Sequence, residues 1–325
     1  VIFYASVTEI PDGDDYVTIS NHDVTVTANA GFGHLEFSAS GNNEPILTIN
    51  SGISLVGYPD EEDGAITFAA SGGKVFAGTK TLTCNILGTV TCLWLTMETT
   101  TTLGNIVCNL ENGGTLTIDD DLTLISDGAD TDVMLDAGTT TGTSNVLNLG
   151  GSLIGADGID GVIDMGDEAG KSTFNFNGTA PQIIVMGDPS DLRYSDIKVS
   201  NTSNASLGSN VSTTNVTGDI TVSVGSVFDD NGFSNFFIGD MINSGTFNTS
   251  GTNVFLGEIT SSGTIASSGS IDLSGDFTNS GTFTSTGCNI NISGNWNNTG
   301  TYTYFSGDNV TFDGAGVSTI TGATD

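Results

Sequence analysis

Short runs in which apolar and polar residues alternate recur along the whole chain. Five occur in the first half, at positions 24–27, 47–49, 81–83, 116–118 and 122–124, and residues such as Gly, Asn and Asp separate them. Because successive side chains of a strand point to opposite faces, such runs predict short β-strands with one buried face. No segment shows the regular apolar spacing of a capped helix. The pattern therefore predicts an all-β chain.

A sequence repeat is visible between positions 239 and 302. Four segments begin at the nearly evenly spaced Gly239, Gly257, Gly275 and Gly294, and they read GDMINSGTF, GEITSSGTI, GDFTNSGTF and GNWNNTGTY. A looser copy begins earlier, at Gly218. Each unit closes with a second apolar alternation, at Val254/Leu256, Ile271/Leu273, Ile290/Ile292 and Val310/Phe312. Copies in such constant register are a structural repeat.

A fixed period of about 20 residues, with two or three short alternating runs in each unit, is typical of a β-solenoid. We predict a parallel, right-handed β-solenoid (β-helix) with about 18–24 residues per coil. The apolar side chains point into a narrow core, and each coil packs on the coils above and below it. Gly and Asn are expected at corners where the backbone needs a positive φ.

Over residues 218–314, the Gly-Asp-Phe-Thr-Asn-Ser-Gly-Thr-Phe pattern resembles the β-helix repeats of large secreted bacterial surface proteins and adhesins. The resemblance implies a parallel β-helix in an extracellular setting. It implies no catalytic residues, because these repeats are scaffolds that serve varied tasks.

The regularity of the repeat divides the chain into three segments. Residues 1–16 are an apolar N-terminal strand, residues 17–217 are an irregular β-solenoid, and residues 218–325 are the regular β-solenoid repeats. Both solenoid segments use the same short alternating runs. The boundary at residue 218 therefore marks a change in regularity.

The charge of the chain is strongly one-sided. It has 38 acidic residues against five Lys and Arg, which gives a net charge of −33 at pH 7. Such a charge argues against binding nucleic acid or anionic lipid through a basic face. It favours cations, basic partners or a salty environment, although acidity also simply keeps an external protein soluble.

The chain begins at Val1 without Met, and its apolar start is too short for a membrane span and lacks a basic flank. We interpret this as a processed start, and we expect an extracellular or cell-surface protein. No later stretch is long and apolar enough to cross a bilayer, so no membrane span is expected.

The sequence offers little for catalysis. His22 and His34 lack a neighbouring Ser or Cys motif, and we expect both on the coil surface. A polysaccharide lyase needs a basic catalyst and a hydrolase needs paired carboxylates, so Arg193, the only arginine, keeps that alternative open. An ion pair explains Arg193 equally well. Of the two tryptophans, Trp94 and Trp296, the second occupies a core position of the repeat. We predict no enzymatic activity.

Four acidic residues in a glycine-rich stretch suggest a calcium site. They are Asp157, Asp160, Asp164 and Asp167. Calcium takes six to eight oxygen ligands, and such a segment supplies several. The spacing matches neither an EF-hand nor a strict nonapeptide repeat, and a solvated turn is the alternative. Calcium is the only cofactor that we expect.

Two of the four cysteines share the same local sequence. They belong to Cys84-Asn85-Ile86 and Cys108-Asn109-Leu110, and their separation corresponds to one wide coil. The two cysteines then stack at strand spacing, and we predict a disulfide between them. The alternative is that small apolar Cys side chains simply fill the core. Cys288 stays unpaired.

Nine Asn-x-Ser/Thr sequons are candidates for glycosylation. They start at Asn177, Asn201, Asn204, Asn210, Asn215, Asn248, Asn291, Asn297 and Asn309. In a chain so rich in Asn, Ser and Thr, most of them arise by chance.

The ends of the predicted solenoid suggest a function. A solenoid exposes open strands at its ends unless they are capped, and neither end of this sequence resembles a polar cap. The first residues, Val1, Ile2, Phe3, Tyr4 and Val7, favour a β-strand that pairs with a neighbouring copy or covers its own first coil.

Head-to-tail contacts of this kind do not close, so they build a homopolymer. We therefore predict an extracellular structural protein, a self-assembling subunit of a filament, sheath or surface layer. The first alternative is a monomeric adhesin-like rod that binds a cell-surface glycan. The second alternative is a polysaccharide lyase or hydrolase.

Overall fold

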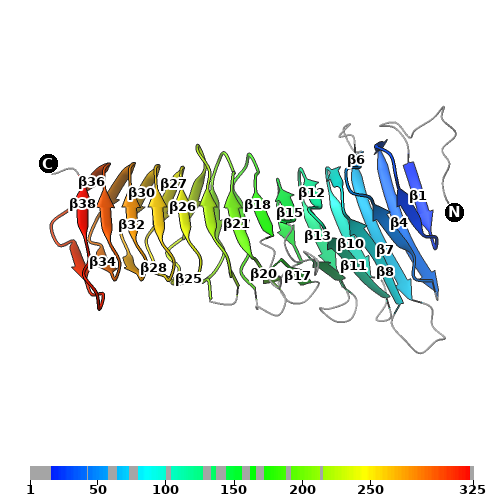
Figure 1. Ribbon diagram of the computed structural model, residues 1–325. Helices are drawn as coiled ribbons and strands as arrows, with labels where there is room; N and C mark the ends of the chain where they lie inside the picture. The colour runs from blue at the N-terminus through cyan, green and yellow to red at the C-terminus, as the bar shows by residue number, and fades with distance from the viewer. Residues whose placement is uncertain are drawn as a thin grey trace. The chain divides into compact units, whose positions relative to one another are not determined.

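The computed structural model describes residues 16–41, 43–57, 64–72, 80–99, 104–126, 133–136, 144–155, 162–165, 172–187, 192–212 and 215–322. These residues form short β-strands and no helix (Figure 1). Neighbouring strands pair in parallel, and strands of successive coils stack in chain order. The predicted parallel β-solenoid is confirmed.

The chain divides into two compact units. Unit 1 contains Val1–Phe174 and Gly187–Arg193, and unit 2 contains Asn175–Met186 and Tyr194–Asp325. The division falls inside β18 (Thr173–Phe176). The change in repeat regularity at Gly218 lies within unit 2.

Unit 1 contains strands of three parallel sheets, each named here after its first strand. The β1 sheet contains β1 (Tyr16–Ser20), β4 (His34–Gly41), β7 (Ala65–Gly72), β10 (Leu95–Thr99), β13 (Leu122–Ile125) and β16 (Leu153–Ile154). The β2 sheet contains β2 (Val24–Val26), β5 (Ile46–Ile49), β8 (Lys80–Ile86), β11 (Gly104–Leu110), β14 (Val133–Asp136), β17 (Val162–Asp164) and β20 (Leu192–Arg193). Of the 13-stranded β3 sheet, unit 1 contains β3 (Ala30–Phe32), β6 (Ser54–Gly57), β9 (Thr89–Cys92), β12 (Thr115–Ile118) and β15 (Val146–Leu149).

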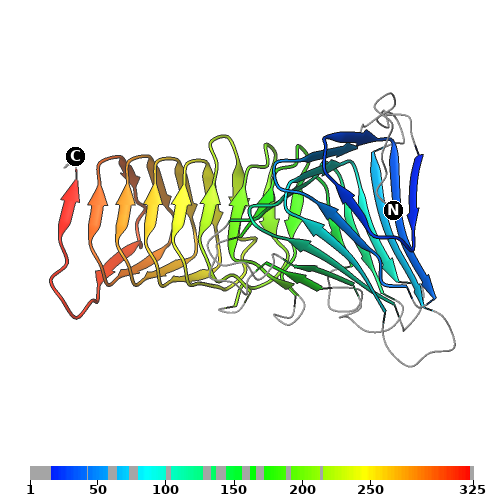
Figure 2. The same ribbon diagram turned by 45° about the vertical axis from the view of Figure 1, so that its right-hand side comes forward.

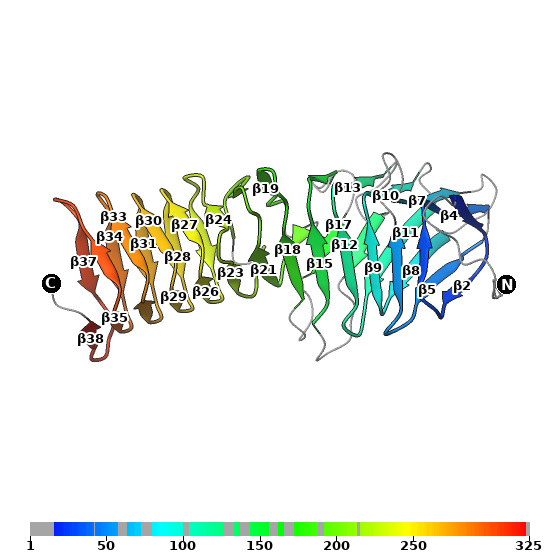
Figure 3. The same cartoon turned by 90° about the horizontal axis from the view of Figure 1, so that it is seen from above.

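Aliphatic columns form the core of unit 1. Leu35, Ile66, Leu95 and Leu122 occupy one register position on successive strands, and all four are buried. Figure 3 shows β5, β8 and β11 of a second sheet side by side. Burying one such side chain contributes about 1.5–3 kcal/mol, so each column stabilises the stack along its length.

Several coils of unit 1 are longer than the sequence repeat predicts. Leu47 pairs with Cys84, and Leu35 pairs with Ile66, so the chain between the members of each pair is well beyond the predicted coil length. The prediction extended the period of the C-terminal repeat to a region without one. Extra residues between strands cost little, because the entropy of closing a loop grows slowly with its length.

Unit 2 also contains strands of three parallel sheets. The β19 sheet contains β19 (Gln182–Ile184), β22 (Ala205–Leu207), β24 (Val227–Asp229), β27 (Thr246–Thr249), β30 (Thr264–Ser267), β33 (Thr282–Ser285) and β36 (Thr301–Thr303). Of the 13-stranded β3 sheet, unit 2 contains β21 (Asp196–Val199), β23 (Ile220–Val222), β26 (Met241–Asn243), β29 (Ile259–Ser261), β32 (Phe277–Asn279), β35 (Trp296–Asn298) and β38 (Ile320–Gly322). The β25 sheet contains β25 (Asn235–Phe237), β28 (Thr252–Phe255), β31 (Ser270–Leu273), β34 (Asn289–Ile292) and β37 (Asn309–Phe312).

The sequence repeat corresponds to the coils of unit 2, which Figure 2 shows as the yellow to red strands. Met241 pairs with Ile259, Ile259 with Phe277, and Phe277 with Trp296. The register predicted from the repeat glycines is therefore confirmed. Trp296 is buried and stacks on Phe277 with ring centroids 4.6 Å apart, as a core position requires.

The glycines of the repeat have a different role from the predicted one. A Cβ atom at Gly263, Gly281 or Gly300 would overlap the carbonyl oxygen of the glycine one coil before it. None of these three has a positive φ, which occurs instead at turns such as Asn112-Gly113. In the repeat, glycine is required because two backbones approach closely, and only a residue without a Cβ fits.

Buried polar columns form one corner of unit 2. Asn243, Ser261, Asn279 and Asn298 occupy one register position on successive strands and are buried. The side-chain amide of Asn279 donates a hydrogen bond to Oδ1 of Asn298 at 2.7 Å. Because an unpaired buried polar group is costly, such bonds favour one register of stacking over its alternatives.

Candidate functional surfaces

Acidic residues, most of which follow a repeat glycine, form a ladder along unit 2. Side-chain oxygens of Asp196, Asp219 and Asp240 accept the backbone N–H of the residue one coil later, at 2.7–2.9 Å. Asp276 accepts the N–H of Asn295 in the same way, at 2.7 Å. The repeated Gly-Asp pair thus links successive coils outside the β-ladder.

The ladder places like charges at strand spacing. Two carboxylates about 5 Å apart repel by about 0.8 kcal/mol even at the dielectric constant of water. The N–H and side-chain amide of Asn295 lower the pKa of Asp276, because they stabilise its charged form. Among the residues that the structure describes, no three His, Cys, Asp or Glu side chains are grouped to hold a metal ion. The hydrogen bonds of the ladder to the following coil give it a structural role.

A buried carboxylate lies at one end of a column of hydroxyl groups in unit 2. Asp230 accepts hydrogen bonds from Oγ1 of Thr249 at 2.6 Å and from Nδ2 of Asn253 at 2.7 Å. Burial alone would raise the pKa of Asp230, but these bonds and the backbone N–H groups of Ser250 and Gly232 lower it. Asp230 therefore stays ionised and fixes the corner around it.

Asp308 lies at the other end of the same column of hydroxyl groups. Thr249, Ser267 and Ser285 occupy one register position, and the hydroxyl of Ser285 donates to Asp308. Asp308 also accepts the backbone N–H of Cys288 at 2.9 Å. Two carboxylates thus terminate the hydroxyl column.

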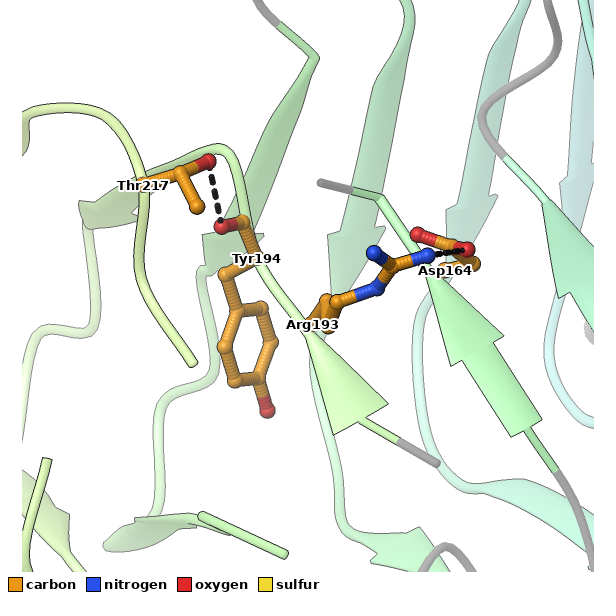
Figure 4. A network of polar contacts seen from close by, with 4 residues as sticks. All are labelled: Asp164, Arg193, Tyr194 and Thr217. Carbon is orange, nitrogen blue, oxygen red and sulfur yellow. Dashed lines mark hydrogen bonds and ion pairs between the residues drawn. The ribbon is translucent and has the colours of Figure 1, made fainter. Parts of the chain in front are cut away.

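The predicted calcium cluster is only partly visible. Asp157, Asp160 and Asp167 lie outside the described residues. Asp164 is in β17 and forms an ion pair with Arg193 of β20, its partner in register (Figure 4). The alternative explanation of Arg193 by an ion pair is therefore supported, because Asp164 on the neighbouring strand is its partner. Calcium binding stays a prediction.

Tyr194 is the first residue of the second segment of unit 2, Tyr194–Asp325. Its side chain is buried, and its hydroxyl donates to the carbonyl oxygen of Val185 at 2.9 Å. The hydroxyl of Thr217 donates to the carbonyl oxygen of Tyr194 at 3.4 Å (Figure 4). These bonds serve the fold.

The register predicted for the cysteines is confirmed, but the structure does not contain the predicted disulfide between Cys84 and Cys108. Cys108 pairs with Cys84 in the ladder, and all four cysteines are buried free thiols. Stacked strands hold aligned Cβ atoms about 4.8 Å apart, beyond the usual 3.5–4.5 Å of a disulfide. A hydrogen bond with Cys108, together with burial, raises the pKa of Cys84 well above its usual value. These thiols fill the core.

The two histidines occupy the first coils of unit 1. His22 is exposed, and His34 stacks on Tyr16 with ring centroids 4.5 Å apart. The hydroxyl of Tyr16 donates to Glu36 at 2.9 Å, and this bond raises the pKa of Tyr16. The group packs one strand on the next.

Two of the nine sequons are unsuitable for glycosylation in the folded protein. Asn201 and Asn215 are buried. The Asn201 amide donates to Gln182, and Asn215 accepts a hydrogen bond from Ser212. The other seven are partly or fully exposed, at Asn177, Asn204, Asn210, Asn248, Asn291, Asn297 and Asn309.

The last coil of unit 2 exposes side chains that are buried in earlier coils. In the column Phe277–Trp296–Ile320, the exposed fraction rises from 2% to 8% and then to 66%. In the next sheet, Ile290 is 1% exposed and its partner Val310 is 37% exposed. The coil of β36, β37 and β38 therefore presents an apolar surface, and within the described residues no further strand pairs with these three. The apolar residues of the predicted assembly strand, Val1, Ile2, Phe3, Tyr4 and Val7, lie outside the described residues.

Comparison with family models, curated proteins and solved structures finds no match. The resemblance to bacterial surface repeats therefore stays a prediction. No helix in the described part of the chain is long and apolar enough to cross a membrane.

Sequence reasoning missed three features of unit 2. The acidic ladder was signalled by the residue after each repeat glycine, which is acidic in three of the four copies. Asp230 had no signal, because most of its partners come from the following coil. The exposed surface of the last coil follows from the repeat itself, once Ile320 is placed in the column of Trp296.

Proposed function

We propose that this protein is an extracellular structural subunit that assembles end to end by stacking the coils of its solenoid. The observation that carries the proposal is the last coil of unit 2, where Ile320 and Val310 are exposed in columns that are otherwise buried. A further coil in the same register would cover both side chains.

Two physical effects favour a second copy at this surface. Burying apolar side chains such as Ile320 is favourable by about 1.5–3 kcal/mol each. In the described part of the chain, one edge of each of β36, β37 and β38 has no pairing strand, and such an edge is a template for another parallel strand. Because the contact joins different ends of two copies, it does not close, and a filament results.

The net charge of −33 opposes this association, because each copy repels the next. Salt shortens the range of the repulsion to about 8 Å at physiological ionic strength. Assembly is therefore expected to strengthen as salt is added. An extracellular setting is consistent with this acidity and with the repeat resemblance.

Sedimentation velocity over a wide range of protein concentration tests the proposal. Ile320→Lys places a charge on the stacking surface and should weaken association by about tenfold or more. Thr321→Lys is the matched control, because Thr321 is the next residue of β38 and its hydroxyl bonds to Asn297 on the outer face. That variant should associate within about twofold of the parent chain.

A parent chain that stays monomeric at every concentration and salt level would contradict the proposal. Equal weakening by Ile320→Lys and Thr321→Lys would also contradict it, because charge alone would then explain the effect.

A further inference from the structure

A groove lies on the outer face of the β19 sheet, and none of its lining residues belongs to the last coil. Its volume is about 300 Å³, and its lining includes Asp229 of β24, Asn248 of β27, Ala266 of β30 and Thr284 of β33. Ser268 and Thr286 contribute from the adjoining turns. All of these residues belong to unit 2.

The groove has a simple origin in the sequence. Asp229, Asn248, Ala266 and Thr284 occupy one register position on four successive strands. Neighbouring strands lie about 4.8 Å apart, so the side chains of this row stand beside one another. Ala266 is the shortest of them, and the space that its side chain leaves is bounded by Asn248 and Thr284.

Four polar side chains of the groove are available to a ligand, whereas the hydroxyls of Thr249 and Ser267, which also line it, bond to Asp230 and Cys288. Within the described residues, the side chains of Asn248, Thr284, Ser268 and Thr286 make no hydrogen bond. Each hydroxyl is both a donor and an acceptor, and the amide of Asn248 adds two donors and an acceptor. Asp229 accepts the backbone N–H of Asn231 at 2.7 Å, so its carboxylate is already partly satisfied.

The charge of the groove limits the ligand. No Lys or Arg is among the described residues that line it, and a chain with a net charge of −33 repels anions. One carboxylate at one end is too few to recognise a polycation. A neutral ligand rich in hydroxyl groups satisfies these donors and acceptors without introducing charge.

The neighbouring row of the same sheet extends this chemistry along the stack. Thr246, Thr264, Thr282 and Thr301 occupy one register position and are at least partly exposed. Their hydroxyls recur at strand spacing beside the groove. The volume of the groove is at the lower end of the range for small-molecule sites. It suits one or two sugar rings, and a longer chain would continue over the threonine row.

We infer that the β19 sheet of unit 2 binds a neutral polysaccharide, with one or two of its sugar rings seated over Ala266. The inference does not depend on end-to-end assembly, because none of the groove residues belongs to the last coil.

Affinity electrophoresis in native gels is a suitable test, because a strongly acidic protein migrates fast unless a neutral polymer in the gel holds it. The probes are laminarin, galactomannan, xylan and dextran, with alginate as the anionic comparison. Retardation by at least one neutral polymer, and none by alginate, is the expected result. No retardation by any neutral polymer, or stronger retardation by alginate, would overturn the inference.

The variant Ala266→Lys fills the groove and should raise the apparent dissociation constant by about tenfold or more. Thr260→Lys is the matched control, since Thr260 faces outward on β29 of another sheet of unit 2 and does not line the groove. It adds the same charge and should change the constant by less than about threefold.

A milder variant, Asn248→Ala, keeps the fold testable if Ala266→Lys fails to fold, and it should weaken binding by about fivefold. Unchanged retardation of both groove variants would overturn the inference. A change in self-association without a change in retardation would assign this face to a second copy instead.

Discussion

The two units stack their coils by different means. Unit 1 relies on aliphatic columns, and its coils vary in length, as the successive pairs Leu47–Cys84 and Cys84–Cys108 show. Coils 239–312 of unit 2 keep a nearly constant period and add polar ladders and stacked glycines to an aromatic core. Unit 1 also contains such contacts, as Asp121 with the N–H of Ser152 and Gly114 with the carbonyl oxygen of Ile86 show, but in unit 2 they recur at a constant period.

The tryptophans allow the two units to be followed separately. Trp94 lies in unit 1, where its indole N–H donates to Asp120 at 2.9 Å, and Trp296 lies in the core of unit 2. The chain has two tryptophans in total. A Trp94→Phe background therefore leaves fluorescence that reports on unit 2 alone.

The largest effect is expected from truncating the aromatic core of unit 2. Phe277 contacts Trp296 and Phe283, with ring centroids 4.6 and 5.3 Å apart. In the Trp94→Phe background, Phe277→Ala should lower the free energy of unfolding by about 3–5 kcal/mol, because it leaves a cavity and removes aromatic contacts. Denaturant titration measures this. The control Thr278→Ala, on the outer face of the same strand, should stay within about 0.5 kcal/mol.

Glycine substitutions should distinguish corners where two backbones approach closely from turns where glycine has a positive φ. Gly281→Ala in unit 2 forces a Cβ against the carbonyl oxygen of Gly263 and should cost about 3 kcal/mol. Gly113→Ala in unit 1 meets no atom within 4 Å, so it should cost only the strain of its positive φ, about 1–2 kcal/mol. Denaturant titration of each unit measures the loss in the free energy of unfolding. Equal losses for Gly281→Ala and Gly113→Ala would contradict the distinction between close backbone contacts and positive-φ turns.

A smaller effect is expected from the acidic ladder. The pKa of Asp276 is lowered in the folded state, so its contribution is present above the unfolded pKa and is lost as pH falls through the folded value. Because Asp276 is close to solvent, this contribution is below about 1 kcal/mol.

The variant Asp276→Asn keeps an acceptor oxygen, as Asn295 does when it accepts the N–H of Thr319 at 2.9 Å. It should leave stability at neutral pH nearly unchanged and should make the melting temperature less sensitive to pH below about 4. Thermal melts at several pH values measure this, and an unchanged pH dependence would argue against the ladder contribution.

The smallest effect concerns the thiols. Burial raises the pKa of Cys92 and of Cys288, so neither is reactive in the folded chain. A thiol reagent should detect none of the four cysteines before denaturation and all four after it. Detection of two after denaturation without a reductant would show that the Cys84–Cys108 disulfide forms in solution.

Much of unit 2 was predictable from the sequence, because the constant spacing of its repeat determines which residues pair between coils. The alternation placed the strands, and the spacing of Gly239, Gly257, Gly275 and Gly294 placed Trp296 in the core. In unit 1, the pairing of Cys84 with Cys108 followed from a repeated tripeptide. In each case a local pattern recurs at the distance that separates spatial neighbours.

The rest was not predictable because it depends on contacts between residues without a recurring pattern. The coil lengths of unit 1 are set by connections that carry no repeat. The role of the repeat glycines depends on how closely two backbones approach, which composition does not reveal. The groove over Ala266 arises from a short residue in a row of longer ones, and this row exists only once the register is known.

The most direct test of the proposed assembly is electron microscopy of the chain at physiological salt, with calcium and with a chelator. The proposal predicts filaments in which the strand spacing of about 4.8 Å continues across each junction between copies, and it predicts their loss in Ile320→Lys but not in Thr321→Lys. Separate particles under every condition, for the parent chain as for the variants, would contradict it.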